Sequence, residues 1–216
     1  PAIARDNLLL EPASRNTGPA IAYAATRIKK DFKNAVMVIL PADQYIAGED
    51  RYIAAIRRGI DFIKKKRGAL LVLGVRPEFP STEFGYVRVE SRKSRVEGVY
   101  KVEKFTEKPD SKTAEKFVSD GRYLWNAGAF VFTAAAILKN IEDYAPKIAD
   151  AFNGMDEIGE VYERLPDISI DYAVMERAAS DRWVVMGAMS VGWNDLGSWT
   201  ALLDAIGCGG TGTVIA

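Results

Sequence analysis

The chain combines short apolar runs with longer segments whose apolar positions recur at helical spacing. Residues 35–40 and 69–75 are almost entirely apolar, which is typical of strands that are buried on both faces. Between them, residues 49–66 place apolar side chains three or four positions apart, which predicts an amphipathic helix. Because strand, helix and strand follow one another, we expect a β-α-β unit and a mainly parallel sheet that helices cover on both faces.

The other segments follow the same two periodicities. Residues 84–90 and 98–109 alternate apolar and polar positions around the charged stretch 91–95, which predicts an antiparallel hairpin with an exposed tip. Further elements are expected as helices at 18–32, 111–120, 133–143, 146–163 and 169–179, and as strands at 123–132 and 182–188. Since no internal repeat, low-complexity tract or interdomain linker interrupts this pattern, the sequence predicts a single α/β sandwich.

The composition limits the kinds of catalytic and metal-binding site that the chain can form. Lysine plus arginine and aspartate plus glutamate each total 29, so no net charge favours nucleic acid as a partner. Histidine is absent, which excludes Ser-His-Asp and Cys-His catalysis and histidine-ligated zinc. Cys208 is the single cysteine, so an intrachain disulfide and a cysteine zinc cluster are also excluded. The remaining chemistry has to come from carboxylates, lysines, arginines, backbone amides and a hard metal ion.

The apolar runs are short. None approaches the roughly 20 residues that a membrane-spanning helix needs, and the first residues lack the pattern of a signal peptide. We therefore expect a cytoplasmic protein that has no membrane partner.

Two aspartates follow predicted strands. Asp43, in LPADQYI, comes after the strand 35–40, and Asp195, in WNDLGSW, comes after the strand 182–188. Asp43 alone also fits a simple turn, since proline and aspartate both favour turns. If the two strands are parallel neighbours, both carboxylates lie at the edge of the sheet where α/β proteins bind ligands. Two carboxylates together with substrate phosphates commonly hold Mg²⁺, so we expect a magnesium site here.

Two more motifs lie between these aspartates. FTEKP presents Glu107 and Lys108 at a corner that Pro109 fixes, so it offers an acceptor and a cation. WNAGAF presents Asn126 beside Gly128, so it offers an amide to a sugar hydroxyl. Each motif also has a simpler interpretation, an exposed charged turn for the first and an ordinary loop asparagine for the second. The local sequence leaves both interpretations open.

The order of the motifs carries a resemblance to a known family. The chain resembles the mannose-1-phosphate guanylyltransferases, a branch of the sugar-phosphate nucleotidylyltransferases, in the motifs LLLEPASRNTGPAIAYAA, LPAD, FTEKPD, WNAGAF, SIDYAVMER and WNDLGSW. The resemblance runs from about Leu9 to Trp199. It implies a Rossmann-like three-layer α/β/α sandwich of the nucleotide-diphospho-sugar transferase type, with a mainly parallel, mixed sheet. The activity that it implies is transfer of GMP from GTP to mannose 1-phosphate, which forms GDP-mannose and pyrophosphate.

The resemblance also implies roles for individual residues. Asp43 and Asp195 correspond to the magnesium pair, and Lys108 to a contact with the sugar phosphate, so these three are the expected catalytic residues. The residues implied to form the sugar site are Gly85, Tyr86, Glu107, Asn126 and Gly128. Asp171 lies in the motif of the mannose branch, without an assigned contact.

The segment that the resemblance assigns to the nucleotide base contains Glu11, Arg15, Asn16 and Thr17. A carboxylate at Glu11 would accept two hydrogen bonds from the adjacent N1–H and N2–H₂ donors of guanine. The alternative is that Glu11 only forms a structural turn before the proline that follows it.

The chain departs from the family in three places. Gln44 replaces the usual histidine after the metal aspartate, and Glu83-Phe84-Gly85-Tyr86 replaces the usual Gly-Tyr-Gly-Tyr, which bears on the rim of the sugar pocket.

The third departure is that the opening glycine-rich loop of the family is not found. We therefore expect 1–206 to be a catalytic domain that is incomplete at its N-terminus, with residues missing before Pro1, and 207–216 to begin a C-terminal segment. Without a triphosphate loop, the chain alone should be catalytically incompetent.

Three other functions stay open. One is a nucleotidylyltransferase for another base or sugar phosphate. A glycosyltransferase has a similar sheet and metal-binding aspartates, but the sequence contains no compact Asp-X-Asp. A non-catalytic homologue that senses a nucleotide-sugar would be expected to lose the metal aspartates. The sequence does not decide the oligomeric state, for which a homodimer is one option.

Overall fold

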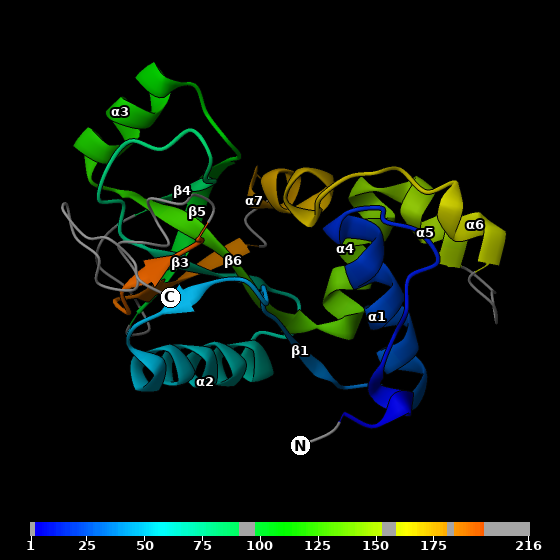
Figure 1. Ribbon diagram of the computed structural model, residues 1–216. Coiled ribbons are helices and arrows are strands. Elements are labelled where there is room, and N and C mark those ends of the chain that lie inside the picture. The colour runs from blue at the N-terminus through cyan, green and yellow to red at the C-terminus, as the bar shows by residue number, and fades with distance from the viewer. Residues whose placement is uncertain (1–2, 91–97, 153–158, 181–183, 197–216) are drawn as a thin grey trace, which may run out of the picture.

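The computed structural model describes residues 3–90, 98–152, 159–180 and 184–196 (Figure 1). The hairpin tip at 91–95, Cys208 and the expected C-terminal segment 207–216 lie outside these residues. Within them, no helix has both the length and the apolar character needed to cross a bilayer.

Six strands form the main sheet, in the order β1-β6-β3-β7-β5-β4, and β6 pairs in addition with β4. The strands are β1 (Val36–Ile39), β3 (Leu70–Val75), β4 (Tyr86–Val89), β5 (Val99–Thr106), β6 (Tyr123–Thr133) and β7 (Val184–Met189). A separate antiparallel ribbon consists of β2 (Tyr45–Ile46) and β8 (Trp193–Asn194). The predicted hairpin is confirmed, because β4 and β5 pair antiparallel.

The sheet is mixed. β3 and β7 pair in parallel, whereas the other pairings described in this sheet are antiparallel. The expectation of mainly parallel neighbours was therefore wrong, although the α/β class is confirmed. β1 and β3 do run in the same direction, but β6 lies between them and is antiparallel to both. The apolar runs predicted burial on two faces, and burial does not reveal the direction of the neighbouring strand.

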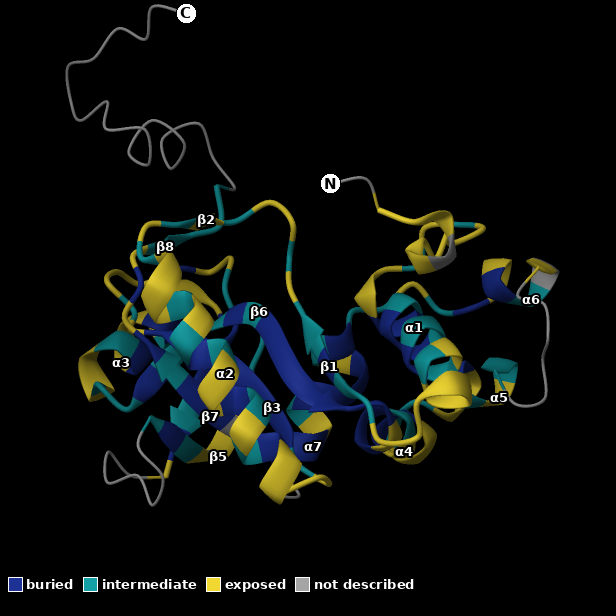
Figure 2. Cartoon of the chain, turned by 90° about the horizontal axis from the view of Figure 1, so that it is seen from below, coloured by how far each residue is buried: buried dark blue, intermediate teal, exposed yellow. Residues whose placement is uncertain are grey.

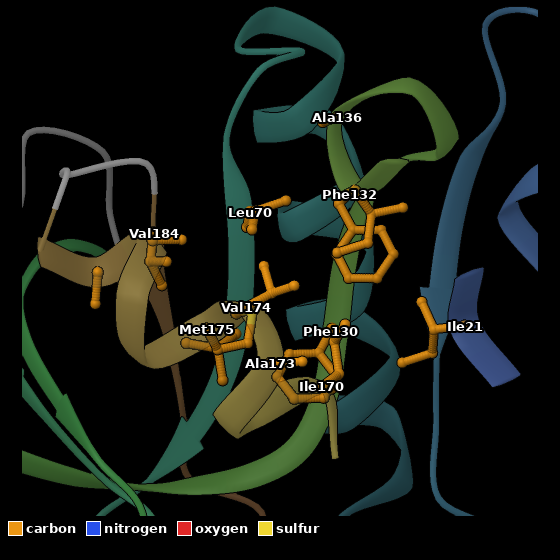
Figure 3. Packing of buried hydrophobic residues seen from close by; sticks show 14 of the residues in the cluster. Ile21, Leu70, Phe130, Phe132, Ala136, Ile170, Ala173, Val174, Met175 and Val184 are labelled. Carbon is orange, nitrogen blue, oxygen red and sulfur yellow. The ribbon is translucent and has the colours of Figure 1, made fainter. Parts of the chain in front are cut away.

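Helices cover both faces of the sheet, so the three-layer arrangement is confirmed. Along β3, Leu70 and Val72 belong to one hydrophobic cluster, and Leu71 and Leu73 to another, because successive side chains of a strand point to opposite faces. Figure 3 shows the first cluster, in which Phe130 and Phe132 of β6 meet Val174 and Met175. The helical elements that contribute to this cluster include α1 (Thr17–Asp31), α4 (Ala134–Tyr144), η2 (Asp171–Met175) and α7 (Glu176–Ser180).

The opposite face carries α2 (Glu49–Lys65). Gly59 of α2 is buried, and a Cβ there would lie 3.3 Å from both Leu71 and Val131, so the helix packs closely on β3 and β6. α3 (Ser111–Asp120) packs on the same cluster through Phe117, whose ring stacks on Tyr123 at 3.9 Å between centroids. Figure 2 shows β6 as a long and largely buried ribbon beside α2.

The predicted helices agree closely with those observed. Asn16 caps α1, since its Oδ1 accepts a hydrogen bond from the N–H of Thr17 at 2.9 Å. The helix expected at 146–163 is described as α5 (Pro146–Phe152) and α6 (Gly159–Glu163). The helix expected at 169–179 begins with the π-helical turn η2, which continues into α7. A 3₁₀ turn, η1 (Arg5–Asn7), lies near the N-terminus.

Candidate active site

The register of the sheet brings three of the expected sugar-site residues together. Tyr86 pairs with Thr106 of β5 and also with Trp125 of β6, so Gly85 lies one step beyond, next to Glu107 and Asn126. The N–H of Asn126 donates to the carbonyl oxygen of Gly85 at 2.7 Å. A Cβ at Gly85 would collide with Oε2 of Glu107 and lie 3.2 Å from Cβ of Asn126. A side chain at position 85 would therefore have to displace the Glu107 carboxylate.

A bulge in β6 orients Asn126. Leu73 of β3 pairs with Ala129, whereas Gly74 pairs with Asn126, so Ala127 and Gly128 have no partner in β3. Gly128 has a φ of 66° and donates its N–H to Oδ1 of Asn126 at 2.9 Å. Nδ2 of Asn126 donates to Oδ1 of Asp171 at 2.8 Å. Both ends of the amide are thereby held, and Asp171 joins the group.

The carboxyl group of Glu107 is perturbed by its surroundings. Its N–H donates to Oε1 of Glu176 at 2.7 Å, while its own Oε2 is buried and has no hydrogen-bond partner among the described residues. Burial, followed by the carboxylate of Asp171, raises the pKa of Glu107 to about 7, against the opposing effect of Lys108. Burial likewise raises the pKa of Asp171, although the hydrogen bond from Asn126 opposes this effect.

Glu176 was not among the expected site residues. It lies within the SIDYAVMER motif, and its acidic character was the signal that could have identified it. Lys108 is exposed and has a φ of 43°, in the left-handed region that a residue other than glycine adopts only under constraint. Pro109, which is buried, follows it and restricts its backbone. The corner at Lys108 is therefore a fixed feature of the fold.

Tyr86 does not lie at the surface of this group. Its side chain is fully buried, its ring packs against Phe117 and Trp125, and its hydroxyl accepts a hydrogen bond from the N–H of Ser81 at 2.9 Å. The expectation that Tyr86 contacts the sugar is therefore replaced by a role in the core. Both faces of β4 are covered at this point, since Val87 is as fully buried as Tyr86, and the motif alone does not specify this.

The two expected metal ligands lie at one end of the β2–β8 ribbon. Tyr45 pairs with Asn194, so Asp195 follows this pair directly and Asp43 precedes it by two residues. The expectation that neighbouring parallel strands carry the two aspartates was wrong, because β1 and β7 are not neighbours in the main sheet. Asp43 is exposed and Asp195 is half-buried. Oδ1 of Asn194 accepts a hydrogen bond from the N–H of Leu196 at 2.8 Å, which closes a turn around Asp195.

Gln44 joins this ribbon to the bulge of β6. Its Nε2 donates to the carbonyl oxygen of Ala127 at 2.8 Å, and its Oε1 accepts from Nε1 of Trp193 at 2.9 Å. A Cβ at Gly128 would lie 3.7 Å from the Gln44 Nε2, so the two loops lie close together. Gln44, which the sequence marked only as a departure from the family, therefore connects the ribbon that carries the expected metal ligands to the bulge beside the expected sugar site.

The donor set fits a hard divalent cation. Asp43 and Asp195 provide carboxylate oxygens, which Mg²⁺ prefers. Within the described part of the chain, no group of three or more acidic or cysteine side chains could hold a metal ion. A cation held by this pair would therefore also need water or substrate oxygens, which is usual for Mg²⁺.

The expected base-binding segment packs against residues 162–170. The hydroxyl of Tyr162 donates to Oε1 of Glu11, and the guanidinium of Arg15 donates to the carbonyl oxygen of Glu163. Burial and the contact with Glu11 raise the pKa of Tyr162. Oγ1 of Thr17 accepts from the N–H of Ile170 at 2.9 Å. Glu11 thus makes a hydrogen bond within the protein, and Asn16 serves as a helix cap.

The chain is similar to known proteins in sequence and in fold. The chain is 37% identical to the mannose-1-phosphate guanylyltransferase of Escherichia coli K12 over 216 aligned residues, which cover 92% of this chain and 44% of that protein. The chain thus spans less than half the length of this relative. A crystal structure from Thermus thermophilus, named as a mannose-1-phosphate geranyltransferase, superposes with a TM-score of 0.83 at 33% identity and covers 93% of this chain and 58% of that one.

Two further comparisons concern the fold and the family. A mannose-6-phosphate isomerase from Helicobacter pylori superposes with a TM-score of 0.71 at 30% identity, covering 86% of this chain and 72% of that one. The fold is accordingly a Rossmann-like α/β arrangement of the nucleotide-diphospho-sugar transferase type. The family described as Nucleotidyl transferase matches residues 4–207. This chain belongs to the nucleotidyl transferase family.

Proposed function

We propose that this protein transfers GMP from GTP to mannose 1-phosphate, which forms GDP-mannose and releases pyrophosphate. The observation that carries the proposal is the group of Gly85, Glu107, Asn126 and Asp171, which the register of three strands and one hydrogen bond bring together. The choice of mannose and guanine rests on the Escherichia coli relative and on the motifs that the chain shares with the mannose branch.

The sugar site is proposed at this group. A hydroxyl-rich ring needs acceptors and donors that are already fixed, because leaving a buried partner unpaired costs about 1–3 kcal/mol. Asn126 is oriented by Asp171 and Gly128, and the unpaired Oε2 of Glu107 offers an acceptor. Lys108, next in the chain, is proposed to contact the phosphate of the sugar. The lack of a side chain at Gly85 leaves the Glu107 carboxylate its place beside Asn126.

Asp43 and Asp195 are proposed to hold Mg²⁺. A bound magnesium ion would screen phosphate charge and withdraw electrons from the phosphorus that is attacked. The ribbon places both aspartates at one end, and Gln44 ties that end to Ala127 beside the sugar site. The metal and sugar sites are therefore proposed to face one common substrate.

The proposed chemistry needs no general base. A phosphate oxygen of mannose 1-phosphate forms a bond to the α-phosphorus of GTP, and the bond from that phosphorus to the bridging oxygen of pyrophosphate breaks. The attacking oxygen is already an anion at neutral pH, which suits a protein without histidine. The task of the protein is to position two polyanions in line and to offset their repulsion.

The base is proposed to contact the segment that contains Glu11, Arg15, Asn16 and Thr17. Tyr162 donates to one oxygen of Glu11, so this contact orients the carboxylate without using all of its acceptor sites. Guanine offers two adjacent donors to such a carboxylate, and adenine does not.

The test is a substrate comparison on the full-length protein. GTP should react with mannose 1-phosphate faster than ATP, CTP or UTP do, and faster than GTP reacts with glucose 1-phosphate. Asp43→Asn and Asp195→Asn should each reduce turnover strongly at saturating magnesium, since a metal clamp contributes several kcal/mol. Asp61→Asn, an exposed position of α2, is the charge-matched control. Turnover that prefers another pair of substrates, or near-normal turnover in both metal variants, would contradict the proposal.

A further inference from the structure

Glu176 contacts Glu107 of the proposed sugar site. It is the first residue of α7 and is half-buried, and its Oε1 accepts the hydrogen bond from the N–H of Glu107 at 2.7 Å. This bond joins a helix on one face of the sheet to the corner that follows β5. The main chain of Glu107 is thereby held by the side chain of Glu176, a residue outside the expected site.

The π-helical turn accounts for the position of Glu176. The N–H of Glu176 donates to the carbonyl oxygen of Asp171, five residues earlier, which closes the wide turn. In an ordinary α-helix, residues five apart would point about 140° away from each other. In the wider turn the angle between the two side chains is smaller. Asp171 can therefore bond to Asn126 while Glu176 bonds to Glu107.

Three carboxyl groups consequently share one small region. Glu107, Asp171 and Glu176 act on one another electrostatically, and the one cation found to act on Glu107 from the described residues is Lys108. The three acids also act on the exposed side chain of Tyr172, and partial burial followed by their charges raises its pKa. Full ionisation would place three negative charges around the unpaired Oε2 of Glu107. A proton retained by the group reduces that repulsion.

We propose that Glu176 is a positioning residue for the proposed sugar site, which fixes the main chain of Glu107 and adds its charge to those that act on the Glu107 carboxyl group. Burial and Asp171 act more strongly on the protonation of Glu107, so Glu176 shifts its pH dependence rather than creating it. This inference rests on the proposed function of the group. When protonated, Glu107 donates a hydrogen bond to a ligand oxygen, and when ionised it only accepts. Since the pKa of Glu107 is raised to about 7, this change falls near neutral pH. A ligand that carries phosphates should bind more tightly below that pH, because ionisation adds repulsion.

Two variants separate the two effects of Glu176. Glu176→Gln keeps an oxygen that accepts the N–H of Glu107 but removes the charge, whereas Glu176→Ala removes both. Glu142→Gln removes one charge from an exposed position of α4 and serves as the control. In the ligand-free protein, ¹³C NMR of the glutamate carboxyl groups reports the titration of Glu107, and the signal missing in Glu107→Gln assigns it.

The first readout does not depend on the proposed function. Glu107 should titrate near neutral pH in the unmodified protein and at lower pH in Glu176→Gln, with no change in Glu142→Gln. Titration of Glu107 in the ordinary range of a glutamate, or at the same pH in Glu176→Gln, would overturn the inference.

The second readout is binding of GDP-mannose, whose diphosphate does not titrate near neutral pH, followed by calorimetry across pH. Affinity should fall as pH rises through neutrality, and the inflection should move to lower pH in Glu176→Gln. In Glu176→Ala, affinity should be about tenfold weaker even at the acidic end, because the main-chain hydrogen bond is lost. Equal affinity in Glu176→Ala and Glu176→Gln would overturn the positioning role. If GDP-mannose binds to none of these proteins while Glu107 titrates as expected, the proposed function fails, and the NMR result still supports the effect of Glu176 on Glu107.

Discussion

Replacing Gln44 by methionine keeps the length of the side chain and removes both of its hydrogen bonds. In the structure these bonds join Ala127 of the β6 bulge to Trp193 of the β2–β8 ribbon, at 2.8 and 2.9 Å. The ribbon has two residues in each strand, and so short a ribbon is not stable by itself. We therefore expect Gln44→Met to loosen the ribbon, and with it the positions of Asp43 and Asp195.

The magnitude follows from the two bonds. A hydrogen bond contributes about 1 kcal/mol net, and a donor left unpaired in a partly buried place costs somewhat more. Trp193 is half-buried, so water compensates in part for the loss at its Nε1. The expected loss of unfolding free energy in Gln44→Met is about 2 kcal/mol.

The assay combines urea unfolding, followed by circular dichroism, with tryptophan fluorescence and calorimetric titration of Mn²⁺. Unfolding should begin at lower urea, the tryptophan emission should change, and Mn²⁺ should bind more weakly. Gln44→Glu keeps the acceptor for Trp193 but places an oxygen opposite the carbonyl of Ala127, so its instability should be relieved at acidic pH, where the carboxyl group can donate. Gln44→His, the residue usual in the resembled family, retains a donor and an acceptor and should stay near the parent.

The result that refutes this reasoning is a Gln44→Met protein within about 0.5 kcal/mol of the parent, which is the usual effect of a surface substitution. Unchanged tryptophan emission in the same protein would show that the two bonds do not hold the ribbon.

Two further predictions concern stability. Glu107 has a pKa of about 7 when folded, against an ordinary value of 4.5, so folding takes up a proton between these values and the folded state loses stability as pH rises through them. The side chain in Glu107→Gln cannot titrate, so its unfolding free energy in urea should differ little from that of the parent near pH 4. Near pH 8 the variant should be more stable than the parent by about 1–3 kcal/mol, after allowance for the partial exposure of Glu107. A difference in stability that does not change with pH would contradict this. In Gly18→Ala, the new Cβ would lie 2.6 Å from the carbonyl oxygen of Ile168, which accepts the N–H of Gly18 at 3.0 Å, so unfolding should cost about 1–3 kcal/mol less. Gly159→Ala, whose Cβ would meet nothing within 4 Å, is the control, and equal effects at both positions would show that the contact with Ile168 is not responsible.

The local sequence pattern was sufficient to predict most helices and strands and the types of side chain available for catalysis. Apolar spacing predicted α1 and α2 to within a residue or two, since a helix buries one face whatever lies against it. The absence of histidine limited the chemistry to carboxylates, cations and a hard metal before any contact was visible. The ordered motifs predicted the family, which the match over residues 4–207 confirms.

The tertiary structure decided which segments meet. Periodicity reports that a face is buried but does not identify its partner, so β6 between β1 and β3 could not be foreseen from β1 and β3. The same limit applies to the site. Tyr86 turned inward to the core, and the ribbon through Gln44, rather than adjacent parallel strands, brought Asp43 and Asp195 to one end. The contact between Glu107 and Glu176 joins residues 69 positions apart across a sheet and a π-helical turn, and no local signal encodes a register of that kind.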